Sequence, residues 1–123
     1  MIKNVILDVD TIGAMKIRAL CPDATLIYIL PPSWDELKSR LSSTGIYTEE
    51  EVNALMEIAE EEISCANSYD YILVNDTISN TLSRFAQIIH SNRYSRNCMK
   101  EFLDSYIDGE VKPHVQSYKE ALL

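Results

Sequence analysis

The stretch "TLIYILPPSWDELKSRL", residues 25–41, contains the pattern of a strand, a turn and a helix in direct succession. Its apolar run, residues 26–30, has the length and composition of a strand that is buried on both faces. The two prolines that follow stop the strand, and Ser33 is a typical N-cap for the helical pattern behind it. The stretch therefore predicts one β-α unit of an α/β fold.

The same pattern occurs on both sides of this stretch. "NVILDVD" (residues 4–10) precedes an amphipathic segment at residues 11–21, and "YDYILVND" (residues 69–76) precedes a helical stripe that begins near Ser79. Between them, Thr48 and Glu51 have the spacing of a capping box at the start of a further helix. The order of elements predicts an α/β fold in which about three parallel strands are flanked by helices.

The end of the chain has helical patterns only. An apolar stripe from Met99 to Ile107 predicts a helix closed by Gly109, and Pro113 is expected to open a short terminal helix. A chain of 123 residues is about one domain, which we expect to span residues 1–123.

Composition excludes several classes of partner. The formal net charge of −8 repels nucleic acid and anionic lipid, so we expect neither nucleic acid nor a membrane as a partner. No apolar run approaches the ~20 residues of a membrane span, and the first residues do not form a signal-peptide pattern. Three widely spaced cysteines favour free thiols in a reducing cytoplasm. They form no metal-ligand cluster with His90 or His114, so no metal site is expected.

The candidate ligand-binding residues follow the three apolar runs. Ligands of parallel α/β sheets bind beyond the carboxyl ends of the strands, where this chain has Asp8 and Asp10, then Ser33, then Asn75. Each residue also has a purely structural interpretation. Aspartate often caps the helix that follows, so one of the two acids is expected to cap residues 12–15 while the other faces the cleft. Asn75 either contacts a ligand or turns the chain after its strand.

Four segments together resemble the guanylate kinase family. "VILDVDTIGA", "LIYILPPSWDELKSRLSSTG", "TEEEVNAL" and "YDYILVND" occur in the order of the family's motifs and at matching spacings, over about residues 3–92. The resemblance covers only the C-terminal half of the family's sequence. It implies a three-layer parallel sheet like that of nucleoside monophosphate kinases of the phosphate-binding-loop (P-loop) class. Active members transfer the γ-phosphate of ATP to GMP with Mg²⁺.

The resemblance also implies roles for single residues. Asp8 and Asp10 match the acidic pair at the GMP and metal end of the cleft, and are the candidate substrate-binding residues. Arg40 matches the first nucleotide-contacting arginine, and Asn75 matches the asparagine near the adenine, beside a wall that includes Ser33. From the sequence alone, Arg40 could equally be a solvated residue of its helix or the partner of an acid one turn before it.

The departures from the family concern charge. Thr44 and Leu55 stand where the family has two further arginines, and no G-x-x-x-x-G-K-[ST] segment occurs in the chain. From Leu41 to Ser83 there is no lysine or arginine, whereas the same 43 residues carry seven Glu and two Asp. Phosphoryl transfer depends on loop amides, a lysine, Mg²⁺ and arginines that stabilise the transferring group. We therefore expect no catalytic residue, no cofactor and no guanylate kinase activity in the isolated chain.

Two functions remain open at this stage. The first is a truncated, inactive guanylate kinase-like protein, a pseudoenzyme that acts as a binding or interaction module and binds GMP or ATP weakly at most. The second is the C-terminal part of an active guanylate kinase, which converts ATP and GMP to ADP and GDP once a separate or upstream N-terminal segment completes it. ATP and Mg²⁺ would then be required.

The resemblance implies a physical problem in the sheet. In the family, the strand that feeds the phosphate-binding loop lies between the strands that match residues 4–10 and 25–30. Strands ~10 Å apart cannot form hydrogen bonds, because neighbours lie ~4.8 Å apart, and unpaired buried backbone groups are costly. The strands could close up, or another chain could cover the gap. We favour a homo-oligomer or a protein partner over a monomer.

Overall fold

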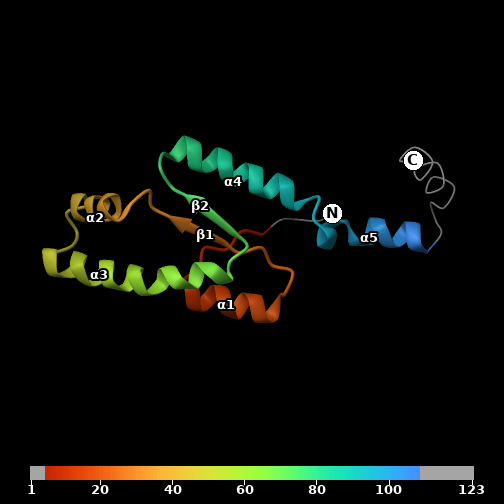
Figure 1. Cartoon of the computed structure of the whole chain (residues 1–123), viewed down its shortest axis with the longest axis horizontal. Coiled ribbons are helices and arrows are strands. Elements are labelled where there is room, and N and C mark those ends of the chain that lie inside the picture. The colour runs from red at the N-terminus through yellow and green to blue at the C-terminus, as the bar shows by residue number, and fades with distance from the viewer. Residues whose placement is uncertain (1–4, 109–123) are drawn as a thin grey trace. The chain divides into compact units, whose positions relative to one another are not determined.

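A computed structural model of the chain describes residues 5–108. Gly109 and Pro113, with the helix end and helix start predicted there, lie outside the described residues. The chain divides into two compact units, residues 1–85 and 86–123, which are described separately. The elements (Figure 1) are α1 (Thr11–Leu20), β1 (Ile27–Leu30), α2 (Trp34–Ser43), α3 (Glu49–Glu62), the 3₁₀ helix η1 (Ile63–Ser68), β2 (Tyr71–Val74), α4 (Ile78–Asn92) and α5 (Arg96–Ile107).

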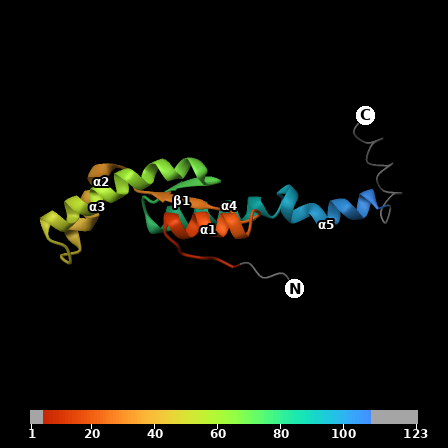
Figure 2. The ribbon, with the colours of Figure 1, turned by 90° about the horizontal axis from the view of Figure 1, so that it is seen from below.

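The first unit is built around a parallel pair of strands, so the predicted α/β class with a parallel sheet is confirmed. β1 pairs with β2 in a register that sets Ile27 opposite Tyr71 and Leu30 opposite Val74. Parallel strands need a long crossover connection, and here α2, α3 and η1 provide it. In Figure 1 and in the perpendicular view of Figure 2, the strand pair lies between α3 and the first part of α4.

The prediction of a strand over residues 4–10 is wrong for the residues that the structure describes. The sheet contains two strands, and residues 5–10 belong to no strand or helix. The apolar side chains of this segment are exposed, Val5 at 79% and Ile6 at 67%. A strand forms only beside a neighbour that satisfies its main-chain hydrogen bonds. Among residues 5–108 this segment has no such neighbour.

Side-chain caps define the starts of α2 and α3, as the sequence predicts. The Ser33 Oγ accepts a 3.0 Å hydrogen bond from the Glu36 amide at the start of α2. At the start of α3, the Thr48 hydroxyl accepts from the Glu51 amide, and the Glu51 carboxylate accepts from the Thr48 amide. Such caps satisfy amides that have no partner within the helix. The turn between α2 and α3 contains Gly45 at a φ of 69°, a left-handed conformation that favours glycine.

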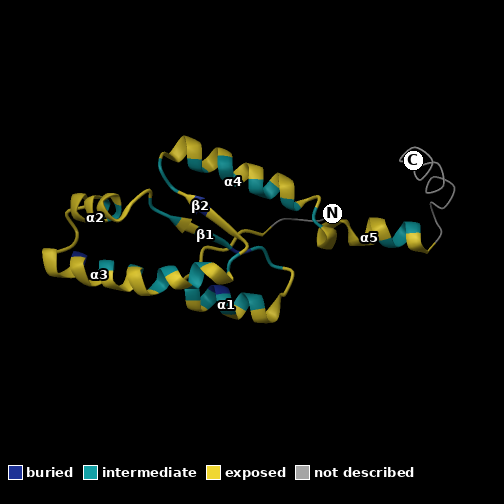
Figure 3. Cartoon of the chain, in the orientation of Figure 1, coloured by how far each residue is buried: buried dark blue, intermediate teal, exposed yellow. Residues whose placement is uncertain are grey.

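The core of the described chain is small. Only four of its residues are buried, namely Ala14, Leu26, Val52 and Leu73. Figure 3 shows how few they are beside the exposed and intermediate positions. A chain of this size ordinarily buries about two thirds of its surface and carries a larger apolar interior. Much of the apolar surface of the described part of the first unit is therefore exposed.

An ion pair fixes α1 to the start of the sheet. Arg18 donates from Nη2 to the Asp70 Oδ2 at 2.8 Å, and the same carboxylate oxygen accepts from the Leu26 amide at 2.8 Å. Asp70 thus connects α1, the entry to β1 and the entry to β2 through one side chain. The pair lies at the amino ends of the strands, opposite to the edge where the candidate ligand residues follow.

Within residues 5–108, no helix has both the length and the apolar character that crossing a membrane requires.

Candidate functional site

The two strands end side by side, as the sequence predicts. Leu30 and Val74 are the last residues of β1 and β2 and face each other in the register. The Asn75 amide donates to the Leu30 carbonyl at 2.7 Å, which extends the ladder by one residue. The turn that contains Ser33 and the turn that contains Asn75 therefore leave the sheet at the same edge. This edge is the candidate site.

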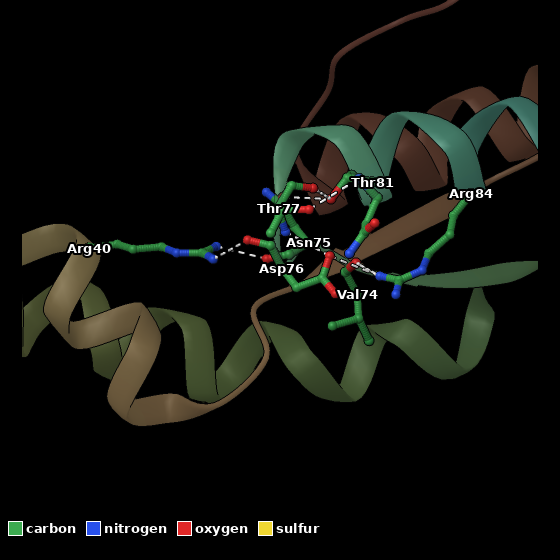
Figure 4. Close-up of polar contacts among 8 residues, drawn as sticks. Arg40, Val74, Asn75, Asp76, Thr77, Thr81 and Arg84 are labelled. Carbon is green, nitrogen blue, oxygen red and sulfur yellow. Dashed lines mark hydrogen bonds and ion pairs between the residues drawn. The ribbon is translucent and has the colours of Figure 1, made fainter.

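Arg40 is the best-connected side chain of the candidate site. Its Nη1 donates to the Asn75 carbonyl at 2.9 Å and its Nη2 donates to the Asp76 carbonyl at 3.0 Å. Its Nε forms a 2.9 Å ion pair with Glu36, one turn earlier on α2. Figure 4 shows the guanidinium reaching from α2 to the turn between β2 and α4. All three guanidinium nitrogens are therefore bound to protein acceptors.

A second arginine holds the same turn from the other side. Arg84, on α4, donates from Nη1 to the Val74 carbonyl at 3.1 Å and to the Asp76 Oδ1 at 3.0 Å (Figure 4). The Asp76 Oδ1 also accepts a 2.7 Å hydrogen bond from the Thr77 amide. Two positive charges and one carboxylate thus meet at the end of β2, and each has its partner inside the chain.

These contacts lower the pKa of Asp76 below its ordinary value of 3.8, first through the hydrogen bond from the Thr77 amide and then through Arg84. A carboxyl group whose pKa is lower in the folded than in the unfolded state stabilises the fold when it is ionised. This stabilisation is complete above the ordinary pKa. It is lost as the pH falls through the lowered pKa of the folded state.

We expect the Asp76→Asn variant to have a lower free energy of unfolding than the wild type above pH 3.8. The difference between the two proteins should shrink as the pH falls below that value. The neutral amide cannot form the ion pair with Arg84, so the variant lacks the part of the stability that depends on ionisation. Urea unfolding of both proteins across a pH series measures the difference. Asp23→Asn, at an exposed position away from this turn, is the control. A difference that stays constant with pH would contradict the assignment.

The other predicted nucleotide-binding residues have structural partners too. The Asn75 Oδ1 accepts a 2.9 Å hydrogen bond from the Thr81 hydroxyl, which joins the turn to the first part of α4. Ser33 is the N-cap of α2. Their proposed contacts with a nucleotide remain predictions.

The acidic pair is divided between two environments. The Asp10 Oδ1 accepts a 2.7 Å hydrogen bond from the Gly13 amide and caps α1, whereas Asp8 lies exposed in the segment before it. This agrees with the expectation that one of the two acids caps the helix. Because residues 5–10 are not part of the sheet, the pair does not follow a strand at the edge where Ser33 and Asn75 lie.

The described residues do not fit a metal site by themselves. Over residues 5–108, no three or more His, Cys, Asp or Glu side chains are grouped so that they could hold an ion. Mg²⁺ is bound in proteins through one or two carboxylates together with water and substrate phosphates. Asp8 and Asp10 could therefore contribute to such a site only in the presence of other ligands.

Two residues of α4 that bind the turn, Thr81 and Arg84, have no clear signal in the sequence. An arginine on an amphipathic helix is ordinarily solvated, and a helical threonine carries no signal of its own. The one available clue to Arg84 is its position two turns after Asp76, on the helix that the turn opens.

The sequence model of the guanylate kinase family matches residues 1–92. The chain is 33% identical over 108 residues to a guanylate kinase of Halalkalibacterium halodurans, which covers 88% of this chain and 53% of the relative. It is 45% identical over 91 residues to a guanylate kinase of Francisella tularensis, in an alignment that covers 73% of this chain and 48% of the relative. It is 36% identical over 117 residues to a guanylate kinase of Clostridium acetobutylicum, in an alignment that covers 94% of this chain and 54% of the relative. The chain thus spans about half the length of the curated relatives it matches.

Proposed function

This chain belongs to the guanylate kinase family, and we propose that on its own it transfers no phosphate from ATP to GMP and acts as a guanylate kinase-like interaction module. The observation that carries the proposal is the state of Arg40. Its three nitrogens are bound to Glu36 and to the carbonyls of Asn75 and Asp76. A guanidinium that holds a turn together is not free to stabilise a transferring phosphoryl group.

The charge of the surrounding chain supports the same proposal. Residues 41–83 contain no lysine or arginine, and Thr44 and Leu55 occupy positions where the family resemblance predicts arginines. α3 has Glu49, Glu50 and Glu51 in its first turn and no basic residue in its last. Negative side chains repel a triphosphate at short range, although salt screens part of this effect.

The interaction surface is proposed to include the free edge of β1. The carbonyls of Leu26 and Leu30 accept hydrogen bonds from the β2 side. Main-chain groups of a strand alternate between its two neighbours, so those of Ile27 and Ile29 face the other edge. Over residues 5–108 no strand pairs with that edge. An unpaired strand edge is a template for another strand, and a second copy or a protein partner would satisfy it.

A second candidate function follows from the fraction of the relatives that the chain covers. The chain matches about half of each guanylate kinase, and its sheet has a free edge. We propose as the alternative that a separate or upstream segment with the phosphate-binding loop completes an active kinase, which then uses ATP and Mg²⁺. Adding the part of the Clostridium acetobutylicum guanylate kinase that this chain does not cover tests it. Turnover that appears only in the mixture supports completion.

We also propose a reducing, cytoplasmic location. Cys21, Cys65 and Cys98 are all free thiols, and Cys21 and Cys98 are exposed. Exposed free thiols are typical of proteins that are kept in a reducing compartment.

Calorimetric titration tests whether the candidate site binds nucleotides. We expect a dissociation constant of ~1 mM or higher for ATP and for GMP, each measured with Mg²⁺. Because Arg40 is bound to protein acceptors, Arg40→Gln should leave the titration curve unchanged. Lys38→Gln, on the same helix, is the matched control. Tighter binding that Arg40→Gln weakens and Lys38→Gln does not would contradict the proposal.

A further inference from the structure

α5, Arg96–Ile107, lies beyond the residues that match the guanylate kinase family model and has an apolar stripe of its own. The stripe includes Phe102, which is 56% exposed, and Ile107, which is 70% exposed. The rings of Phe102 and Tyr106 contact each other edge-to-face at 5.2 Å. The members, spaced three or four residues apart along one face, are Met99, Phe102, Leu103, Tyr106 and Ile107.

A row of charges runs beside this stripe. Arg96, Lys100, Asp104 and Asp108 are four residues apart, so they follow one another along one side of the helix. The first two are basic and the last two are acidic. None of the ion pairs found within residues 5–108 involves any of them.

The order of these charges is unfavourable for a helix that stands alone. A helix has a positive N-terminal end and a negative C-terminal end, so acids are favoured in its first turn and bases in its last. α5 has no acid in its first turn and no base in its last turn. Instead Arg96 lies at the positive end, and Asp104 and Asp108 lie at the negative end. An antiparallel neighbour with the same charge order would compensate both ends.

We propose that the chain self-associates through α5, which packs antiparallel against α5 of a second copy. In an antiparallel helix pair the same row of the two helices meets in opposite directions, as a two-fold axis requires. An axis near Phe102 brings Arg96 opposite Asp108 of the second copy and Lys100 opposite Asp104 of the second copy. The apolar stripes then cover each other between these rows. In a parallel pair the two rows would lie on opposite sides of the apolar seam and would not meet.

The charge complementarity identifies the occupant as a second copy. The row is complementary to its own reverse, which an unrelated apolar surface has no reason to match. The inference does not depend on the proposed function, because it uses no residue of the candidate site or of β1.

Sedimentation of the full chain with two charge-reversed variants tests the proposal. R96E/K100E makes the row entirely acidic, and D104K/D108K makes it entirely basic. We expect the wild type to dimerise. Each variant alone should dimerise at least about tenfold more weakly, because side chains of the same charge then face each other across the pair. An equal mixture of the two variants should associate at least as tightly as the wild type, since every facing pair is then attractive.

The quadruple variant R96E/K100E/D104K/D108K is the matched control. It restores self-complementarity with the charge order reversed, so it should dimerise again, and far-UV circular dichroism checks its helix content. A wild type that stays monomeric up to about 1 mM would overturn the proposal. So would R96E/K100E and D104K/D108K dimers as tight as the wild-type dimer, because association would then occur through another surface. If either variant is unfolded alone, formation of the mixed dimer still decides the question.

Discussion

Replacing Leu73 by alanine is expected to lower the free energy of unfolding by about 2 to 5 kcal/mol, the range for large-to-small substitutions of buried residues. Leu73 is 3% exposed in the middle of β2 and faces Ile29 of β1 across the pair. It is one of only four buried side chains in the described chain. Since small domains are stable by about 5 to 15 kcal/mol, this single loss would remove a large part of the total.

Ile72→Ala provides the matched control on the same strand. Ile72 points to the opposite face from Leu73 and is 50% exposed, so its truncation is expected to cost at most about 1 kcal/mol. Urea unfolding followed by far-UV circular dichroism measures both variants under one condition. Equal losses for the two variants would show that the strand pair is not anchored through Leu73.

Local signals in the sequence predict much of this fold. The caps at Ser33 and at Thr48 with Glu51 form as expected, because the residues that make a cap lie within one helical turn of each other. The apolar runs before Pro31 and before Asn75 form the predicted parallel strands. Each of these two strands pairs with the other, so the local preference for a strand is supported by a tertiary contact.

The first apolar run shows where such signals are insufficient. Residues 5–10 have the composition of a strand and do not form one. The composition of a segment states only that it suits a pleated, half-buried surface. Whether a strand forms depends on a neighbour elsewhere, which the segment cannot encode by itself.

The candidate site is also only partly predictable. The sequence locates Ser33 and Asn75 at one edge, because parallel strands end together. It cannot assign the acceptors of Arg40, since the carbonyls of Asn75 and Asp76 lie 35 and 36 residues further along the chain. Only the ion pair with Glu36, one turn away, is visible as a pattern.

We expect phosphoryl transfer by the isolated chain to be strongly impaired. An arginine that stabilises the transferring phosphoryl group is worth about 10³ to 10⁵ in rate. In this chain Arg40 is bound to protein acceptors, while Thr44 and Leu55 stand where the family resemblance predicts arginines. The sequence also contains no G-x-x-x-x-G-K-[ST] segment, the motif that presents amides and a lysine to the phosphates. We therefore expect the isolated chain to be slower than its full-length relatives by several orders of magnitude.

A coupled assay of the purified chain with ATP, GMP and Mg²⁺, at high protein concentration, measures whether the chain transfers phosphate on its own. The Clostridium acetobutylicum guanylate kinase, similar over 94% of this chain, is the positive control. Leu73→Ala, expected to be strongly destabilised, separates activity of the chain from that of a contaminating kinase. We expect no turnover above background. Turnover near 1 s⁻¹ or faster, the usual range of kinases, would contradict the proposed lack of activity if Leu73→Ala reduces it.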